Sequence, residues 1–246
     1  MSVLLGDGTG ALKNNTRIAF AARILSVFVV ILICTAVSAQ TRLSPTEELV
    51  RITFTSFKHA ILAKDGVRAS QLIDDDTAAL HEKLRQFALN TSKPVLLKER
   101  FSTIVAVLAI RHAFSKDDIQ NISGRAMYGK TIARGDAGAA KAIPSLSIVK
   151  VTPDKNNQSA EAELGMEGFS ETVGMRFRFQ RGSWRINLTE LAEKVSTETE
   201  DRIGITPRTP PEVIESVITQ LLLPALSEQS KRPVSDEIWI PLAQRS

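Results

Sequence analysis

Cysteine and tyrosine are scarce in this chain of 246 residues, with one of each, and neither sign of charge is in large excess. Its one cysteine, Cys34, falls in an N-terminal stretch that we expect to be removed, which leaves the mature chain with none. A disulfide framework, a cysteine nucleophile and thiolate metal sites are thereby excluded from the mature protein. A domain without disulfides must rest on its own apolar core, and this chain is long enough to build one.

The charge balance argues against a nucleic-acid partner. Lysine and arginine exceed aspartate and glutamate by four, and removal of residues 1–39 would reduce that excess to +2. Nucleic-acid binding needs basic residues clustered on one face. We therefore predict no nucleic-acid partner.

Residues 1–39 have the pattern of an N-terminal extension followed by a secretory signal peptide. Arg17 and Arg23 supply its positive end, residues 24–37 its apolar stretch, and Val37-Ser38-Ala39 a cleavage site before Gln40. We expect export to the periplasm or the cell exterior. The alternative is an uncleaved signal that anchors the chain in the membrane, although the apolar run is short for a full span.

Strict alternation of apolar and polar side chains marks three consecutive runs between Ser159 and Leu188. This period of two is typical of antiparallel strands with one buried and one exposed face. A two-residue turn at Arg181-Gly182 would pair Phe179 with Trp184 and Phe177 with Ile186.

The register of the preceding strand pair is also predicted. An odd offset places Leu164 opposite Met175 and Ala162 opposite Phe177, with glutamates facing arginines on the outer face. A slip by one residue would bury those arginines and expose the phenylalanines, so the faces are strongly specified.

Helical periodicity dominates the chain before these strands. Ser44-Pro45 opens the first helix, Asp74 to Thr77 caps a later one, and residues 104–110 are apolar on every side, which predicts a buried helix. The remaining expected segments are a helix opening at Lys93, a Ser115-capped helix, frayed helix and loop over 123–144, a strand at 146–151, a helix from Thr189 to about Val195, a last helix stopped near Pro224, and a docking tail at 238–242.

These segments predict an α+β fold: N-terminal helices packed on a curved antiparallel sheet of about four strands, with a C-terminal helix. The predicted domains are residues 40–195 as a cone-like α+β domain, 196–211 as a linker, and 212–246 as a C-terminal helix and tail.

Two stretches resemble the nuclear-transport-factor-2-like superfamily, over about residues 45–191. One is the capped helix ending in Ala63-Lys64-Asp65-Gly66, and the other is the closing pattern of residues 173–188. In that family a final strand of the form Gly-x-Trp-x-Ile-x-x-Leu is common. The resemblance implies a cone with a pocket between helices and sheet. The side chains expected to line it are apolar: Phe54, Phe57, Met175, Phe177, Phe179, Trp184 and Ile186.

Several short motifs suggest chemistry, and we interpret them as structural or coincidental. Residues 124–131 match the phosphate-binding pattern GxxxxGK[ST], but no buried strand precedes them. Asp74-Asp75-Asp76 is interpreted as a helix cap rather than a cation site. His59, His81 and His112 fall on separate predicted helices. We therefore predict no metal, no cofactor and no catalytic residue.

Three functions remain open at this point. The first is an exported, non-catalytic domain that binds a small apolar ligand or a protein partner in its concavity. The second is an envelope interaction or scaffold protein that uses its C-terminal helix and tail. The third is an isomerase-like or dehydratase-like enzyme with polar groups entering from the helices, His59 and His112 being best placed.

Overall fold

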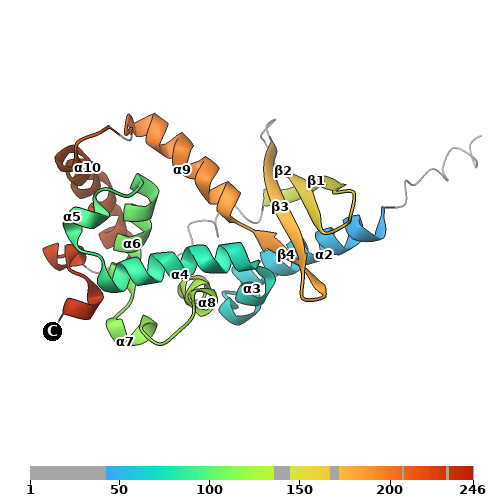
Figure 1. The fold of residues 1–246 in the computed structure, drawn as a ribbon, viewed down its shortest axis with the longest axis horizontal. Helices are drawn as coiled ribbons and strands as arrows, with labels where there is room; N and C mark the ends of the chain where they lie inside the picture. The colour runs from blue at the N-terminus through green and yellow to red at the C-terminus, as the bar shows by residue number, and fades with distance from the viewer. Residues whose placement is uncertain (1–42, 136–144, 167–171, 207, 231–232, 246) are drawn as a thin grey trace, which may run out of the picture. The chain divides into compact units, whose positions relative to one another are not determined.

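The strands form one four-stranded antiparallel sheet in the order β1-β2-β3-β4 (Figure 1), as the alternation predicts. Their bounds are β1 Leu146–Pro153, β2 Ser159–Met166, β3 Thr172–Gln180 and β4 Ser183–Asn187. The structure is a computed structural model that describes residues 43–135, 145–166, 172–206, 208–230 and 233–245. The expected signal segment lies outside these residues. Residues 45–246 form one unit, which contains the sheet and the helices that cover it.

The β3–β4 hairpin has the predicted register. Phe179 pairs with Trp184 and Phe177 with Ile186. Arg181 and Gly182 both adopt positive φ, 54° and 76°, which is the geometry of a mirror-image two-residue turn. That turn matches the right-handed twist of the strands it joins.

The β2–β3 register differs from the prediction by two residues. Ala162 opposes Met175 rather than Phe177, and Glu161 opposes Arg176 rather than Arg178. Alternation determines only which face a side chain occupies, so a shift of two leaves every residue on its predicted face. The pairing within that face depends on the length of the connecting loop, which alternation does not specify.

Two helices before the sheet have the predicted caps, because Asp74 and Ser115 each accept a hydrogen bond from the backbone of the helix they open. Asp65, which follows the first helix, caps the next one in the same way. The helix predicted from Lys93 is instead two helices, separated by a turn that ends at Arg100. The bounds are α2 Pro45–Leu62, α3 Gly66–Leu72, α4 Asp75–Asn90, α5 Lys93–Leu96, α6 Phe101–Ala113 and α7 Lys116–Ile119.

Helix α8, Gly124–Arg134, occupies the first half of the stretch predicted as frayed helix and loop. Its glycines permit close packing rather than flexibility. A Cβ on Gly129 would lie 2.6 Å from the carbonyl oxygen of Gly66 in α3, and a Cβ on Gly124 would lie 2.3 Å from that of Ala78 in α4. Helix α8 thus packs closely against both neighbours because it lacks these two side chains.

The C-terminal helices are longer than predicted. Helix α9 runs Thr189–Ile203, so half of the expected linker is helical. Helix α10, Pro211–Val217, continues through a π-helical segment, Ile218–Leu222, into α11, Leu223–Ser230. The chain therefore stays helical past Pro224, where the sequence predicts a stop. Pro224 has no N–H to donate to the carbonyl of the preceding turn, so one helical hydrogen bond is missing there. The π-helical turn before it, in which the Leu223 N–H donates to the Ile218 carbonyl, coincides with this gap.

Two apolar cores form within this unit. The sheet core lies between α2, α3, α8 and the inner face of the sheet, and the helical core lies between α4, α6, α10 and the C-terminal tail. The tail docks as predicted, since Ile238, Trp239 and Leu242 are buried in the helical core. Neighbouring residues Tyr128 and Met127 on α8 belong to different cores, which ties the two together.

Both edges of the sheet are covered. On β1, Arg51 and Lys58 of α2 donate to the carbonyls of Ile148 and Leu146 at 2.8 and 2.9 Å. On β4, the chain between α3 and α4 adds a parallel bridge at Ile73 and Ile186. Covered edges have few free backbone groups with which another strand can pair.

We predict that Gly129→Ala destabilises the protein, although alanine favours a helix. The added methyl group would overlap the Gly66 backbone, and overpacking of this kind costs about 1–3 kcal/mol. Chemical denaturation measures the change. Gly174→Ala is the matched control, because its Cβ meets only the flexible end of Glu161, 2.9 Å away. Equal stability of the two variants would contradict the close α3–α8 contact.

Candidate binding site

The residues predicted to line a pocket come together, but as a packed core. Phe177 and Ile186 are fully buried, and Phe54, Phe57, Met175 and Trp184 are 4–5% exposed. Phe179 is 37% exposed and packs edge-on against Trp184, with ring centroids 5.7 Å apart. Phe54 also lines a hollow of about 380 Å³ between α2 and β1. The inner face of the sheet is thus filled by the chain's own side chains.

The aspartate run caps helix α4, as expected. Asp74 is buried and accepts hydrogen bonds from the Thr77 amide at 2.8 Å and from the Asn187 side chain at 2.6 Å. Arg178 pairs with Asp76 at 2.5 Å, and Arg125 with Asp75 at 2.8 Å. Within the described residues, no group of three or more histidine, cysteine, aspartate or glutamate side chains is arranged to hold a metal.

The phosphate-binding pattern lies within α8, with Gly124 as the first helical residue after the Ser123 cap. Its amides therefore bond within a helix instead of lining a loop between strand and helix. Lys130 lies 3.9 Å from Asp118, and the hydroxyl of Thr131 donates to the Tyr128 carbonyl. Helical packing accounts for both glycines, and the sequence match is coincidental.

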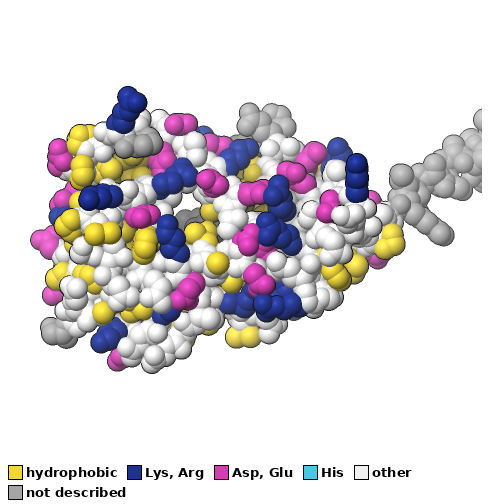
Figure 2. All heavy atoms as spheres, viewed as in Figure 1, with side chains coloured by type: hydrophobic (Ala, Val, Ile, Leu, Met, Phe, Trp, Pro, Cys, Tyr) yellow, Lys and Arg dark blue, Asp and Glu magenta, His cyan; other side chains and the backbone are white. Residues whose placement is uncertain are grey.

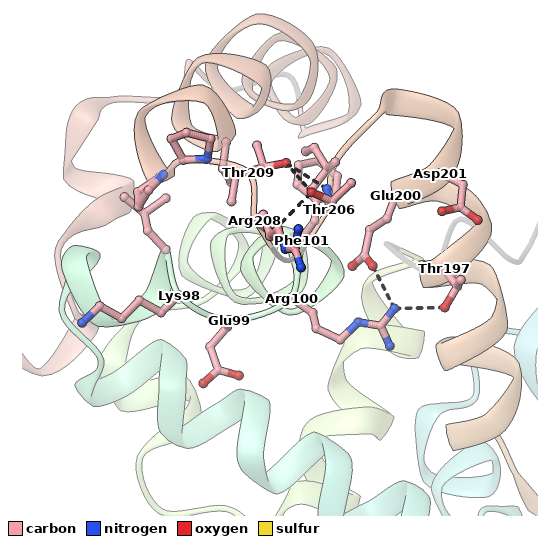
Figure 3. Close-up of a pocket in the computed structure, with 15 residues that line it drawn as sticks. Lys98, Glu99, Arg100, Phe101, Thr197, Glu200, Asp201, Thr206, Arg208 and Thr209 are labelled. Atoms are coloured by element: carbon pink, nitrogen blue, oxygen red, sulfur yellow. Dashed lines mark hydrogen bonds and ion pairs between the residues drawn. The ribbon is translucent and has the colours of Figure 1, made fainter.

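A larger hollow of about 700 Å³ lies beneath the C-terminal half of α9 (Figure 3). We name it the α9 hollow. Its lining comes from the α5–α6 turn, the end of α9, and the chain leading into α10: Leu97, Lys98, Glu99, Arg100, Phe101, Thr197, Glu200, Asp201, Ile205, Thr206, Arg208, Thr209, Pro210, Pro211 and Ile214.

Arg100 joins two walls of the α9 hollow. Its guanidinium donates to Glu200 at 2.9 Å and to Thr197 at 3.0 Å, as the dashed lines in Figure 3 show. The hydrogen bond to Glu200 raises the pKa of Arg100. Burial alone would raise the pKa of Glu200, but hydrogen bonds from Arg100 and Ser196 hold that pKa below its usual range. Both groups are therefore charged at neutral pH, and neither is poised to exchange a proton.

A smaller hollow, of about 300 Å³, shares Arg100 with the α9 hollow as a lining residue. Helices α4, α6 and α9 line it with the apolar side chains of Leu80, Leu84 and Ala106, among others. Here Ser196, the buried residue of α9, hydrogen-bonds to Ser102 at 2.6 Å. Hydrogen bonds from Arg100 and Ser196 thus hold α9 in place next to the α9 hollow and this smaller hollow.

Sequence reasoning missed the α9 hollow. Its walls come from a turn inside an expected helix and from a segment interpreted as a linker. One signal was available: residues 206–211 contain two threonines and three prolines, and binding residues are often found on connecting segments.

Comparison with known proteins yields no relative. No protein family, curated protein or solved structure matches this chain. The resemblance to the nuclear-transport-factor-2-like superfamily therefore stays a prediction. Among the described helices, none has the length and apolar character needed to cross a membrane.

His81 on α4 is a half-buried titratable group outside the hollows. Its ring meets the buried Tyr128 edge-on, with centroids 4.9 Å apart, and its Nδ1 has no hydrogen-bond partner among the described residues. Burial lowers the pKa of His81 to about 4 and raises that of Tyr128. His81 is therefore neutral in the folded protein at physiological pH.

We predict that this burial makes stability depend on pH. Between pH 6.5 and about 4 the unfolded chain binds a proton at His81 that the folded chain does not, so stability is complete above pH 6.5 and falls as the pH drops towards 4. The loss amounts to about 2–3 kcal/mol. In urea titrations, His81→Phe should flatten this dependence, whereas His59→Gln, at an exposed position of α2, should preserve it. An unchanged slope in His81→Phe would contradict the assignment.

Proposed function

We propose that this protein is an exported, non-catalytic binding module whose site is the α9 hollow. The observation that carries the proposal is the hollow's size and composition together. Its volume of about 700 Å³ falls within the range of small-molecule sites, and apolar side chains share its lining with a fixed guanidinium. The signal pattern of residues 17–40 supports export.

The lining indicates the kind of ligand. Phe101, Ile205 and Ile214 offer apolar surface, while Arg100 and Thr197 offer polar groups held by a hydrogen bond between them. A small ligand with an apolar body and one polar end fits this division. Arg100 is held in place by Glu200 before binding, so little side-chain entropy is lost when a ligand arrives.

The two other hypotheses receive less support. An enzyme acting inside the sheet would need space where Phe177 and Trp184 are packed. A scaffold using the C-terminal helix would need a continuous exposed apolar face. Val213 and Ile240 are exposed there, but Ile214, Ile218 and Trp239 are buried in the chain's own helical core.

We predict that an amphipathic aromatic probe, 1-anilinonaphthalene-8-sulfonate, binds the folded protein saturably at one site. Thr197→Tyr should weaken this binding at least fivefold, because the larger ring would occupy the hollow. Thr199→Tyr is the matched control, since both threonines are exposed on α9 and bond to the carbonyl four residues before them. Fluorescence titration measures both. Equal affinity of the two variants, or no saturable binding, would count against the α9 hollow as the site.

A further inference from the structure

Three arginines converge at the turn between β3 and β4. Arg125 of α8 and Arg181 of the turn both donate to the same oxygen of Asp75, at 2.8 and 3.1 Å. Arg185 of β4 is close enough for the charges of Arg125 and Arg181 to affect it. Figure 2 shows lysine and arginine side chains gathered over this region, around α3 and the β3–β4 turn. We name Arg125, Arg181 and Arg185 the arginine cluster.

The arginine cluster carries more positive charge than its neighbours neutralise. Asp74 and Asp76 are engaged by Arg178, which leaves Asp75 as the carboxylate shared within the cluster. Three cations therefore face one anion. Burial, followed by the repulsion of Arg125 and Arg181, lowers the pKa of Arg185, and Asp75 offsets this only in part.

Backbone carbonyls at the end of α3 hold the cluster in place. Arg125 donates to the carbonyls of Ser70 and Ile73 at 2.7 and 2.6 Å, and Arg185 donates to that of Gln71. Arg181 is different, because its side chain is 67% exposed and contacts Asp75 through Nη2. Its Nη1 and Nε have no hydrogen-bond partner among the described residues, so they face solvent as free donors.

From this geometry we propose that the arginine cluster binds a phosphate group. Guanidinium groups present paired N–H donors that match the oxygens of phosphate, and such charge-assisted bonds are roughly twice as strong as neutral ones. A doubly charged anion would neutralise the excess that Asp75 leaves. The site lies on the sheet and α8, and involves none of the residues that line the α9 hollow.

The test is calorimetric titration of the full chain with inorganic pyrophosphate, in parallel with binding to phosphatidylcholine vesicles with and without phosphatidylglycerol. Arg181→Asn removes the exposed guanidinium, and asparagine tolerates the positive φ of the turn. It should weaken binding about tenfold. Asp75→Asn removes the competing carboxylate and should strengthen binding several-fold. Arg202→Asn, an exposed change of equal charge on α9, is the control and should leave affinity unchanged.

The two titrations distinguish a site for free phosphate from a site for a lipid headgroup. Pyrophosphate binding that responds to the variants in these directions supports a site for free phosphate, and a response confined to anionic vesicles supports a lipid headgroup phosphate. Absence of saturable binding in both arms overturns the proposal. So does an equal loss of affinity in Arg181→Asn and Arg202→Asn, because net charge alone would then explain the binding.

Discussion

Helix α4 is held at both ends by buried charges of opposite sign, and it reaches both cores: Ala78 packs against the sheet core, and Leu84 and Ala88 are buried in the helical core. Asp74, fully buried, lies at its N-terminus and ties it to β4 through Asn187. Arg111, 1% exposed, donates to the carbonyls of Phe87, Ala88 and Thr91 at its C-terminus and to that of Trp239 in the tail. Each charge has the sign that the adjacent end of the helix dipole favours. Burial lowers the pKa of Arg111 only to about 10, with Arg245 adding repulsion, so it remains charged.

The proposed binding site lies against the helical core, because Leu97 and Ile214 of its lining belong to that core and none of its lining belongs to the sheet core. Helix α4 runs from the sheet to the helical core, and α9 runs obliquely away from it towards α10, fastened by Arg100 and Ser196 rather than by deep apolar burial (Figure 1). The Arg100–Glu200 contact joins the ends of two long side chains, which leaves space beneath the C-terminal half of α9. Ligand sites commonly occur between packed helices.

Sequence patterns predicted the fold better than the site, for physical reasons. Alternation identified the strands and their faces, because burial of one face requires it. It did not separate registers that differ by two residues, as at Ala162 and Met175. Helix α8 was predicted only as frayed helix and loop because glycine lowers helix propensity, whereas here Gly129 serves a close contact that only the fold reveals. The α9 hollow combines segments about 100 residues apart, and no local pattern links them.

Helices α4 and α8 join the two cores into one cooperative unit, and the chain's two tryptophans report on the cores separately. Trp184 lies in the sheet core and Trp239 in the helical core. In the single-tryptophan variants Trp184→Phe and Trp239→Phe, urea unfolding followed by fluorescence should coincide with unfolding followed by far-ultraviolet circular dichroism. Transitions that separate, with one core unfolding while the other persists, would contradict the account.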